Sequence, residues 1–345
     1  MSKLKYLGTY ISPILALISF NFSGVLAYLG IIVLYILVPI LENLIPKNSY
    51  NFSKDENNLA KEDWFYNWIL YLLVPFHLYV IYVFLVTISN PLLELVDIIG
   101  YVLIMGTILG VNGINGGHEL GHKIDHRLKM FLARVLLTTS MQNHFITYHN
   151  GGHHRDVATP NDLTTAKKGD VFYFFALKSQ IGGYFKSWRL EAEKIKSKGG
   201  NQLLNPMIIH TIIPWSFLGI IYYFFGSEVT VLYFLAAVFG ISILEAQNYF
   251  SHYGLKRKLK EDGTYERVKV EHSWNSDHVI GRVLLFELTR HSDHHFSGAK
   301  PYQILKSKDE SPMLPFGYPA MLILSYFPFI FKPIMEKQLI KYGMD

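Results

Sequence analysis

The sequence of 345 residues contains no cysteine. This absence excludes disulfide bonds and thiolate metal sites within the chain. Charged residues are also scarce, at 17%, whereas hydrophobic residues make up 50%. Soluble domains contain about 25% charged residues, so the composition excludes an ordinary soluble protein. The sequence also lacks internal repeats and low-complexity tracts.

Long apolar segments dominate the chain instead. A helix needs about 20 residues to cross about 30 Å of hydrocarbon, and six segments approach or exceed this length. The first follows a basic start that resembles a signal peptide, but no clear cleavage site follows it, so we expect a retained helix. We predict an all-α integral membrane protein, one membrane domain with six transmembrane helices and a cytoplasmic histidine-rich cap. The expected spans are 7–22, 24–46, 66–88, 95–115, 204–226 and 229–250, and the cap comprises 116–203 and 251–345.

The basic residues predict the orientation. Lysines precede the first segment, lie between the second and third, and are dense between the fourth and fifth, whereas 89–94 and 226–229 contain no Lys or Arg. The positive-inside rule then places both termini and every histidine cluster in the cytoplasm. The net charge of +5 follows from this topology, and we expect no nucleic-acid partner.

Nine of the fifteen histidines lie at the ends of apolar segments. Imidazole is the commonest side-chain ligand for transition metals, and nine exceed what one ion uses. The pattern therefore predicts a multinuclear metal site at a membrane surface. The nine form three clusters and one isolated position: His118 and His122; His149, His153 and His154; His291, His294 and His295; and His252.

The spacing within the clusters is helical. His118 and His122 are four residues apart, so on a helix they share one face and can hold one ion. The cluster at 149–154 repeats this spacing with one extra histidine, and the cluster at 291–295 also fits one helical face. His252 is included because it follows the sixth apolar segment, as the other clusters follow theirs.

The remaining histidines are expected to have structural roles, with His278 as a candidate partner of a ligand. Metal-bound histidines commonly donate their second ring N–H to a carboxylate or a carbonyl. Glu245 is the most suggestive carboxylate, because it lies within an apolar segment, where carboxylates are costly. The structural histidines are His77, His126, His144, His210 and His272, and the carboxylates near the clusters are Glu119, Asp156, Asp162, Glu245, Asp277 and Asp293.

Ligand type alone leaves several chemistries open. All-nitrogen sites suit iron, copper, nickel or zinc, but a site beside apolar helices favours a redox metal and a hydrophobic substrate. His118, Glu119 and His122 also fit the HExxH zinc-protease signature, which would leave the other clusters unexplained. A metal transporter is a further alternative, but the position of the histidines at helix exits disfavours it.

Four segments give the chain a specific resemblance. They are GHELGHK, HNGGHHRDVATPND, NYFSHYGLKR and LTRHSDHH. In order and spacing they resemble the membrane-bound alkane monooxygenases, which belong to the integral-membrane fatty acid desaturases and hydroxylases. The resemblance runs from about residue 100 to 300. It implies a non-haem centre of two iron ions held by the nine histidines, and hydroxylation of medium- or long-chain n-alkanes to primary alcohols.

The resemblance also implies electron donors. Family members receive electrons from rubredoxin, which rubredoxin reductase reduces. Because this chain has no cysteine, we expect the rubredoxin to be a separate protein that docks on the basic cytoplasmic surface. The expected location is the bacterial inner membrane.

The chain departs from the family pattern at Ser251. Alkane hydroxylases usually have glutamate at this position, whereas xylene-type monooxygenases vary there. A methyl-arene hydroxylase and a fatty acid desaturase or hydroxylase, each with the same metal site, therefore remain alternatives. Tyr28 and Tyr35, in the second apolar segment, are candidates for setting the depth of a substrate channel, although packing or interfacial roles suit them as well.

Overall fold

The computed structural model describes residues 3–344, and within them the chain is helical. Two isolated bridges, Leu259–Tyr265 and Asn275–Met313, are the β pairing of the described residues. The helices are α1 Ile11–Ser19, α2 Leu29–Ile32, α3 Val38–Leu44, α4 Lys54–Glu62, α5 Phe65–Ile88, α6 Leu95–Ile108, α7 Asn115–Gly121, α8 Arg127–Thr139, α9 Phe145–Tyr148, α10 His154–Asp156, α11 Phe172–Ser197, α12 Pro206–His252, α13 Val279–Leu284, α14 His291–Phe296, α15 Tyr318–Ser325 and α16 Pro328–Lys341. Short 3-10 helices cover Lys3–Tyr10, Gly24–Tyr28, Gln202–Leu204, Val270–His272 and Tyr302–Ile304, and π-helices cover Val33–Leu37, Leu109–Ile114 and His149–His153.

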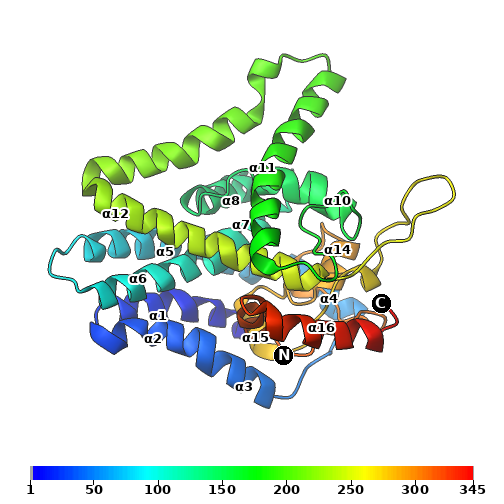
Figure 1. The fold of residues 1–345 in the computed structure, drawn as a ribbon, viewed down its shortest axis with the longest axis horizontal. Helices are drawn as coiled ribbons and strands as arrows, with labels where there is room; N and C mark the ends of the chain where they lie inside the picture. Colours follow the sequence, from blue (N-terminus) through cyan, green and yellow to red (C-terminus); the bar gives the residue numbers. More distant parts are fainter. Residues whose placement is uncertain (1–2, 345) are drawn as a thin grey trace.

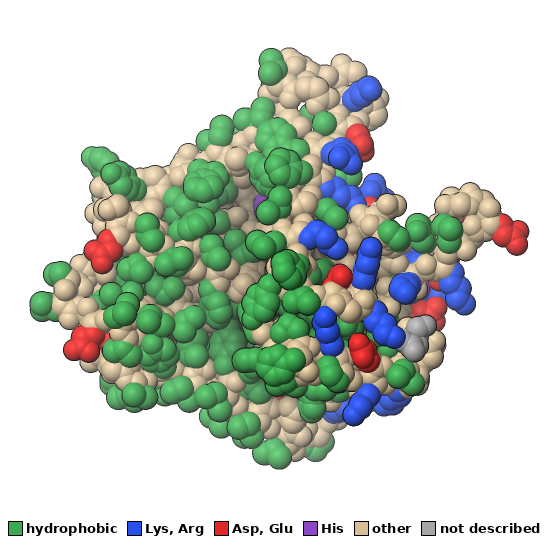
Figure 2. Space-filling model, in the orientation of Figure 1, with side chains coloured by type: hydrophobic (Ala, Val, Ile, Leu, Met, Phe, Trp, Pro, Cys, Tyr) green, Lys and Arg blue, Asp and Glu red, His purple; other side chains and the backbone are tan. Residues whose placement is uncertain are grey.

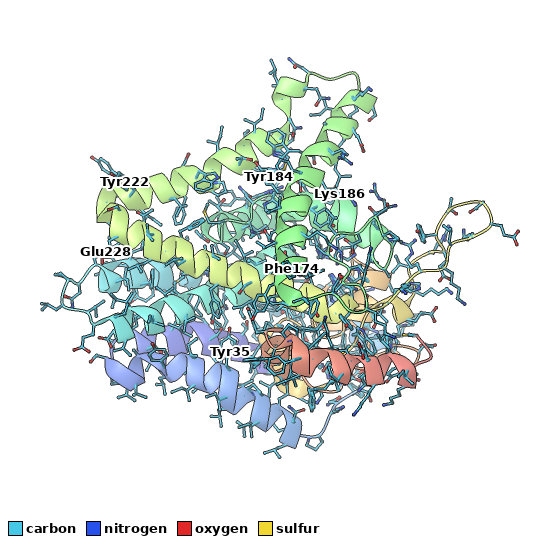
Figure 3. All side chains as sticks on the ribbon, in the orientation of Figure 1. Tyr35, Phe174, Tyr184, Lys186, Tyr222 and Glu228 are labelled. Carbon is cyan, nitrogen blue, oxygen red and sulfur yellow. The ribbon has the colours of Figure 1, made fainter. Side chains whose placement is uncertain are left out.

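Four helical segments among residues 3–344 are long and apolar enough to cross a membrane. They are Gly24–Leu44, Phe65–Ile88, Leu95–Gly121 and Gln202–His252. The last has 51 residues and turns sharply at Gly226, whose φ of 81° is a left-handed conformation suited to glycine. Tyr222 and Glu228 flank this bend (Figure 3). The all-helical membrane architecture is thus confirmed, whereas six spans and a cytoplasmic cap stay predictions.

Glycines let α6 and the second half of α12 approach closely. A Cβ at Gly106 would lie 2.6 Å from the Ala236 carbonyl oxygen, and one at Gly240 would lie 2.8 Å from the Gly106 carbonyl oxygen. Small residues allow such close packing between membrane helices, where the hydrophobic effect does not drive association. This contact matters for the site because each of the two helical segments ends at a histidine-containing stretch.

Apolar and basic side chains gather at opposite ends of the molecule. Figure 1 shows α1, α2, α5, α6 and the bend of α12 at one side, and α14, α16 and the C-terminus toward the other, with the N-terminus beside α15 and α16. Figure 2 shows hydrophobic side chains over the first side and most Lys and Arg at the second. The helix α11 and the first half of α12 meet at the top of this view and diverge downward.

Some predicted element boundaries were wrong. The first apolar segment is divided into a 3-10 helix, Lys3–Tyr10, and α1, which ends at Ser19. Apolar periodicity alone does not reveal such divisions, because 3-10 and α segments bury the same residue types.

A buried ion cluster supports the turn before α14. Glu287 accepts hydrogen bonds from Arg282 Nε at 2.5 Å, Lys5 Nζ at 2.7 Å and Tyr6 Oη at 2.6 Å. The backbone at Phe286 and Glu287 is left-handed, with φ of 52° and 55°, which is costly for residues with a side chain. The cluster therefore holds a strained turn that leads directly into the histidines of α14.

We expect Glu287→Gln to lower the free energy of unfolding by about 3 kcal/mol, because it leaves the cations around a buried, neutral partner. Thermal unfolding in detergent measures this change. Asp63→Asn, which removes a partly exposed pair with Lys3, is the control and should cost less than about 1 kcal/mol. Equal losses in the two variants would contradict the structural role of the cluster.

The same cluster predicts a pH dependence. Burial raises the pKa of Glu287, but Arg282 and Lys5 outweigh it and lower the pKa from 4.5 to about 2. A carboxyl whose pKa is lower in the folded state stabilises the fold above its ordinary pKa. The lowered pKa of Glu287 corresponds to a contribution of about 3 kcal/mol to the free energy of unfolding. This contribution is present above pH 4.5 and is lost as the pH falls toward 2.

Candidate metal centre

The structure brings all nine predicted ligands together, in two groups. The first contains five histidines and the second four, and in each group the ring nitrogens lie within 4.8 Å of one another. The groups are adjacent, since the rings of His154 and His295, one from each, stack with centroids 4.4 Å apart. The five-histidine group is His118, His122, His149, His154 and His294, and the four-histidine group is His153, His252, His291 and His295.

The spacing of the ring nitrogens fits a metal ion. Six pairs of neighbouring Nε2 atoms within the groups lie 2.8–3.2 Å apart, as in His122–His118 at 2.8 Å and His118–His294 at 3.2 Å. Two nitrogens at right angles around one ion, each about 2.1 Å from it, lie about 3.0 Å apart. A ring nitrogen has either one proton or one lone pair, so hydrogen bonds alone fit poorly where Nε2 of His118 meets two others. A shared ion accounts for all of these contacts.

Three ring nitrogens of the four-histidine group are buried without a hydrogen-bond partner: His153 Nε2, His291 Nδ1 and His295 Nδ1. His153 Nε2 is buried and makes no hydrogen bond, which is costly unless something else binds it. Its other nitrogen, Nδ1, lies 2.8 Å from Asp162 Oδ2 and 2.6 Å from Thr164 Oγ1. If Nδ1 carries the proton, Asp162 accepts it and the Nε2 lone pair is left for an ion. The residues present therefore fit a bound metal.

The histidines at 149–154 are not grouped as a regular helical spacing predicts. His149 and His153, four residues apart, lie in different groups, whereas His149 and His154 lie together with Nε2 atoms 2.9 Å apart. The reason is the π-helix His149–His153. Its wider turn aligns residues five apart, and such turns are frequent at functional sites.

The cluster on α14 is likewise divided. His291 and His295 lie in the four-histidine group with Nε2 atoms 3.1 Å apart, while His294 lies in the five-histidine group. Consecutive helical residues point about 100° apart, so neighbouring histidines can serve adjacent ions. The prediction that all three share one face was therefore too coarse. His118 and His122, at the end of α7, do share a group as predicted.

Burial keeps the rings in the metal-binding state. It lowers the pKa of His149, His154, His291, His294 and His295 well below 6.5. These rings are consequently neutral at neutral pH, and neutral imidazole is the form that binds metal. His252 of the four-histidine group is oriented by its second ring nitrogen. Its Nδ1 lies 3.3 Å from the carbonyl oxygen of His272, and its Nε2 lies 3.1 Å from His291 Nε2.

An apolar cavity leads to the centre. It encloses about 1040 Å³ of empty space, its open mouth included. His118 and His149 of one group and His291 of the other form part of its wall. Most of the remaining lining is aliphatic or aromatic, including Leu34, Ile243, Leu285 and Phe250. A hydrocarbon chain is the kind of ligand that such a wall accommodates.

Tyr35 forms part of this wall, and Tyr28 does not. Tyr35 lies in the second apolar segment beside α15 (Figure 3), and its hydroxyl is 3.0 Å from Thr107 Oγ1. Tyr28 packs near Gly100 instead. Asn115, Gln247, Asn248 and Tyr318 also form part of the wall and were not predicted from the sequence. The first three carry a recognisable signal, because they are amide side chains within apolar segments.

The remaining histidines lie outside both groups, as expected. His77 Nε2 is 3.0 Å from Thr139 Oγ1, and His278 Nδ1 is 2.9 Å from Ser276 Oγ. Among the six carboxylates near the clusters, Asp162 is the one hydrogen-bonded to a clustered histidine within residues 3–344. Glu245 accepts from Gln180 at 2.6 Å, and Glu119, the base of the protease alternative, accepts from the backbone N–H of Tyr302.

Comparisons with known proteins identify the family. Residues 95–324 match the family described as fatty acid desaturase. The chain is 32% identical to alkane 1-monooxygenase 1 of Alcanivorax borkumensis, covering 96% of this chain and 83% of that protein, and 32% identical to alkane 1-monooxygenase of Ectopseudomonas oleovorans, covering 93% and 80%. It is 25% identical to the xylene/toluene monooxygenase hydroxylase component of Pseudomonas putida, covering 98% and 89%. Motifs, histidine geometry and these comparisons agree that the chain belongs to the fatty acid desaturase family and, within it, to the alkane 1-monooxygenases.

Proposed function

We propose that this protein hydroxylates the terminal methyl group of medium- or long-chain n-alkanes to give primary alcohols. The observation that carries the proposal is the apolar cavity, whose wall includes His118, His149 and His291. An apolar pocket that ends at a metal centre suits the oxidation of a substrate that has no polar groups.

We assign one iron ion to each histidine group, so that all nine histidines are ligands. The reaction consumes the alkane, one O₂, two electrons and two protons, and yields the alcohol and one water. Bound iron would supply the activation of dioxygen at the end of the cavity. The nitrogen spacing and the orphaned His153 Nε2 support this assignment.

The chain itself performs three tasks in this reaction. The aliphatic wall binds the hydrocarbon and contributes about 25 cal/mol for each Å² of apolar surface that it removes from water. The histidines in the wall place the chain end beside the metal centre. Asp162, with Thr164 and Thr165, fixes the orientation of His153.

We further propose that the chain crosses the bacterial inner membrane six times, with both termini and the metal centre in the cytoplasm. The bend at Gly226 supports two spans within Gln202–His252. The gathering of Lys and Arg at the end that holds α14, α16 and the C-terminus supports the orientation (Figure 2).

Electrons are proposed to come from rubredoxin, reduced by rubredoxin reductase. His122 and His154 are the half-buried members of the five-histidine group, and each is followed directly by a cation, Lys123 and Arg155. A basic surface beside the least buried ligands suits an acidic electron-transfer protein.

Activity of isolated membranes tests the proposal. Membranes containing the protein are incubated with rubredoxin, rubredoxin reductase, NADH and a panel of n-alkanes, fatty acids and xylenes. We expect primary alcohols from alkanes. Activity on fatty acids alone would contradict the proposal, and activity on xylenes alone would favour the methyl-arene alternative that Ser251 and the 25% identical relative support.

Tyr35 provides a prediction about chain length. Tyr35→Ala removes a ring from the cavity wall, so we expect the preferred alkane to become longer. Each additional buried methylene contributes about 0.8 kcal/mol to the free energy of substrate binding. This corresponds to about a fourfold increase in kcat/KM per carbon. Alcohol yields from a series of n-alkanes measure this shift. Tyr28→Ala, in the same segment but away from the wall, is the control, and an equal shift there would contradict the prediction.

A further inference from the structure

Three polar side chains meet beside the metal centre. Ser251 lies at the end of α12, next to His252, and is fully buried. Its Oγ accepts a hydrogen bond from Gln247 Nε2 at 3.0 Å and lies 3.2 Å from Tyr318 Oη. Ser251 therefore joins α12 to the first residue of α15 through one hydroxyl group.

Both partners of Ser251 form part of the cavity wall. Tyr318 also packs edge-on against Phe250, with ring centroids 4.8 Å apart, and Phe250 lines the same cavity. The hydroxyl of Ser251 thus links side chains on two walls, close to His291 of the four-histidine group. Ser251 itself is outside the lining, so it acts through these two neighbours.

The backbone at Ser251 is fixed without the side chain. Its carbonyl oxygen accepts from the Trp274 N–H at 2.9 Å, and Trp274 is fully buried. Removal of the hydroxyl should therefore release Gln247 and Tyr318 while the end of α12 stays in place. This separates the effect of Ser251 on the wall from an effect on the ligand His252.

We propose that Ser251 is a positioning residue that determines which carbon of the hydrocarbon is hydroxylated. The inference rests on the proposed function. Because an aliphatic wall offers a hydrocarbon no directional bond, the shape of the wall selects the carbon that reaches the metal centre. With Tyr318 and Gln247 held by Ser251, the end of the cavity admits the terminal methyl. Without these hydrogen bonds, the side chains of Tyr318 and Gln247 can move, and the second carbon of the hydrocarbon can reach the metal centre.

The ratio of primary to secondary alcohol tests the inference. The substrate is n-octane or n-hexadecane, whichever the wild type oxidises faster, and the variants are Ser251→Ala, Tyr318→Phe and the double variant. We expect each single variant to lower the ratio about fivefold, the effect of one hydrogen bond. The double variant should match Ser251→Ala, because Ser251→Ala already removes the contact between Ser251 and Tyr318. Iron content should stay at the wild-type value, since loss of folding or of metal reduces total turnover without setting this ratio.

Ser242→Ala is a matched control. Ser242 lies on the same helix, its Oγ is 2.7 Å from Tyr326 Oη, and neither residue lines the cavity. We expect it to leave the product ratio unchanged. The inference would be overturned if Ser251→Ala and Tyr318→Phe kept the wild-type ratio of primary to secondary alcohol, or if Ser242→Ala lowered that ratio equally. Either result would leave the proposed function intact. If the wild-type protein forms no alcohol from any hydrocarbon, the proposed function fails and the inference falls with it.

Discussion

His291→Ala is expected to abolish alkane hydroxylation, with a loss well beyond the 10- to 100-fold that follows removal of residues that merely support ligands. His291 is one of only four histidines in its group and also forms part of the cavity wall. The variant leaves only three histidines in this group, His153, His252 and His295. Product formation in membranes, with iron content of the purified protein, measures the effect.

His278→Ala is the control for this prediction. His278 is buried, lies on the chain segment that leads to α14, and belongs to neither group. We expect it to keep most of the activity and all of the iron. Substantial alkane hydroxylation by His291→Ala would contradict the assignment of His291 as an essential ligand of the four-histidine group.

Asp162→Asn is expected to lower both activity and iron affinity by about 10- to 100-fold. Asp162 accepts from Tyr148 Oη at 2.8 Å and from Thr165 Oγ1 at 2.6 Å, besides its contact with His153. Burial raises the pKa of this carboxyl, but His153 and the hydroxyl donors outweigh that and lower it below its ordinary value. The asparagine side chain would place an amide N–H₂ donor among groups that themselves donate hydrogen bonds. The hydrogen bond that orients His153 would therefore be lost.

Iron titration of the purified variant measures the loss of affinity directly. Asp170→Asn is the control, because Asp170 accepts from the backbone N–H of Lys167 and touches no clustered histidine. Iron affinity equal to wild type in Asp162→Asn would show that His153 is held without the carboxylate.

The identity of the candidate ligands could be predicted from the sequence, but their pairing could not. Helical spacing correctly placed His118 with His122, because the helix α7 is regular there. The same rule failed for His149 and His153, because the sequence HNGGH carries no recognisable sign of a π-turn. Likewise, periodicity predicted the apolar segments but not the left-handed bend at Gly226.

Support for the ligands depended on contacts between distant residues. The sequence showed Asp162 as one of six nearby carboxylates, and only the fold of residues 153–165 brings it to His153. The link from Ser251 to Tyr318 joins residues 67 positions apart. Such contacts depend on how α12 and α15 pack, which local patterns do not encode.

Metal content of the purified protein tests the central claim most directly. The two histidine groups predict two iron ions per chain. The variant His252→Ala, which removes one ligand of the four-histidine group, should lose one of these ions. His122→Ala leaves four histidines in the other group and should retain more iron. A single ion per chain, or zinc in place of iron in active protein, would contradict the account.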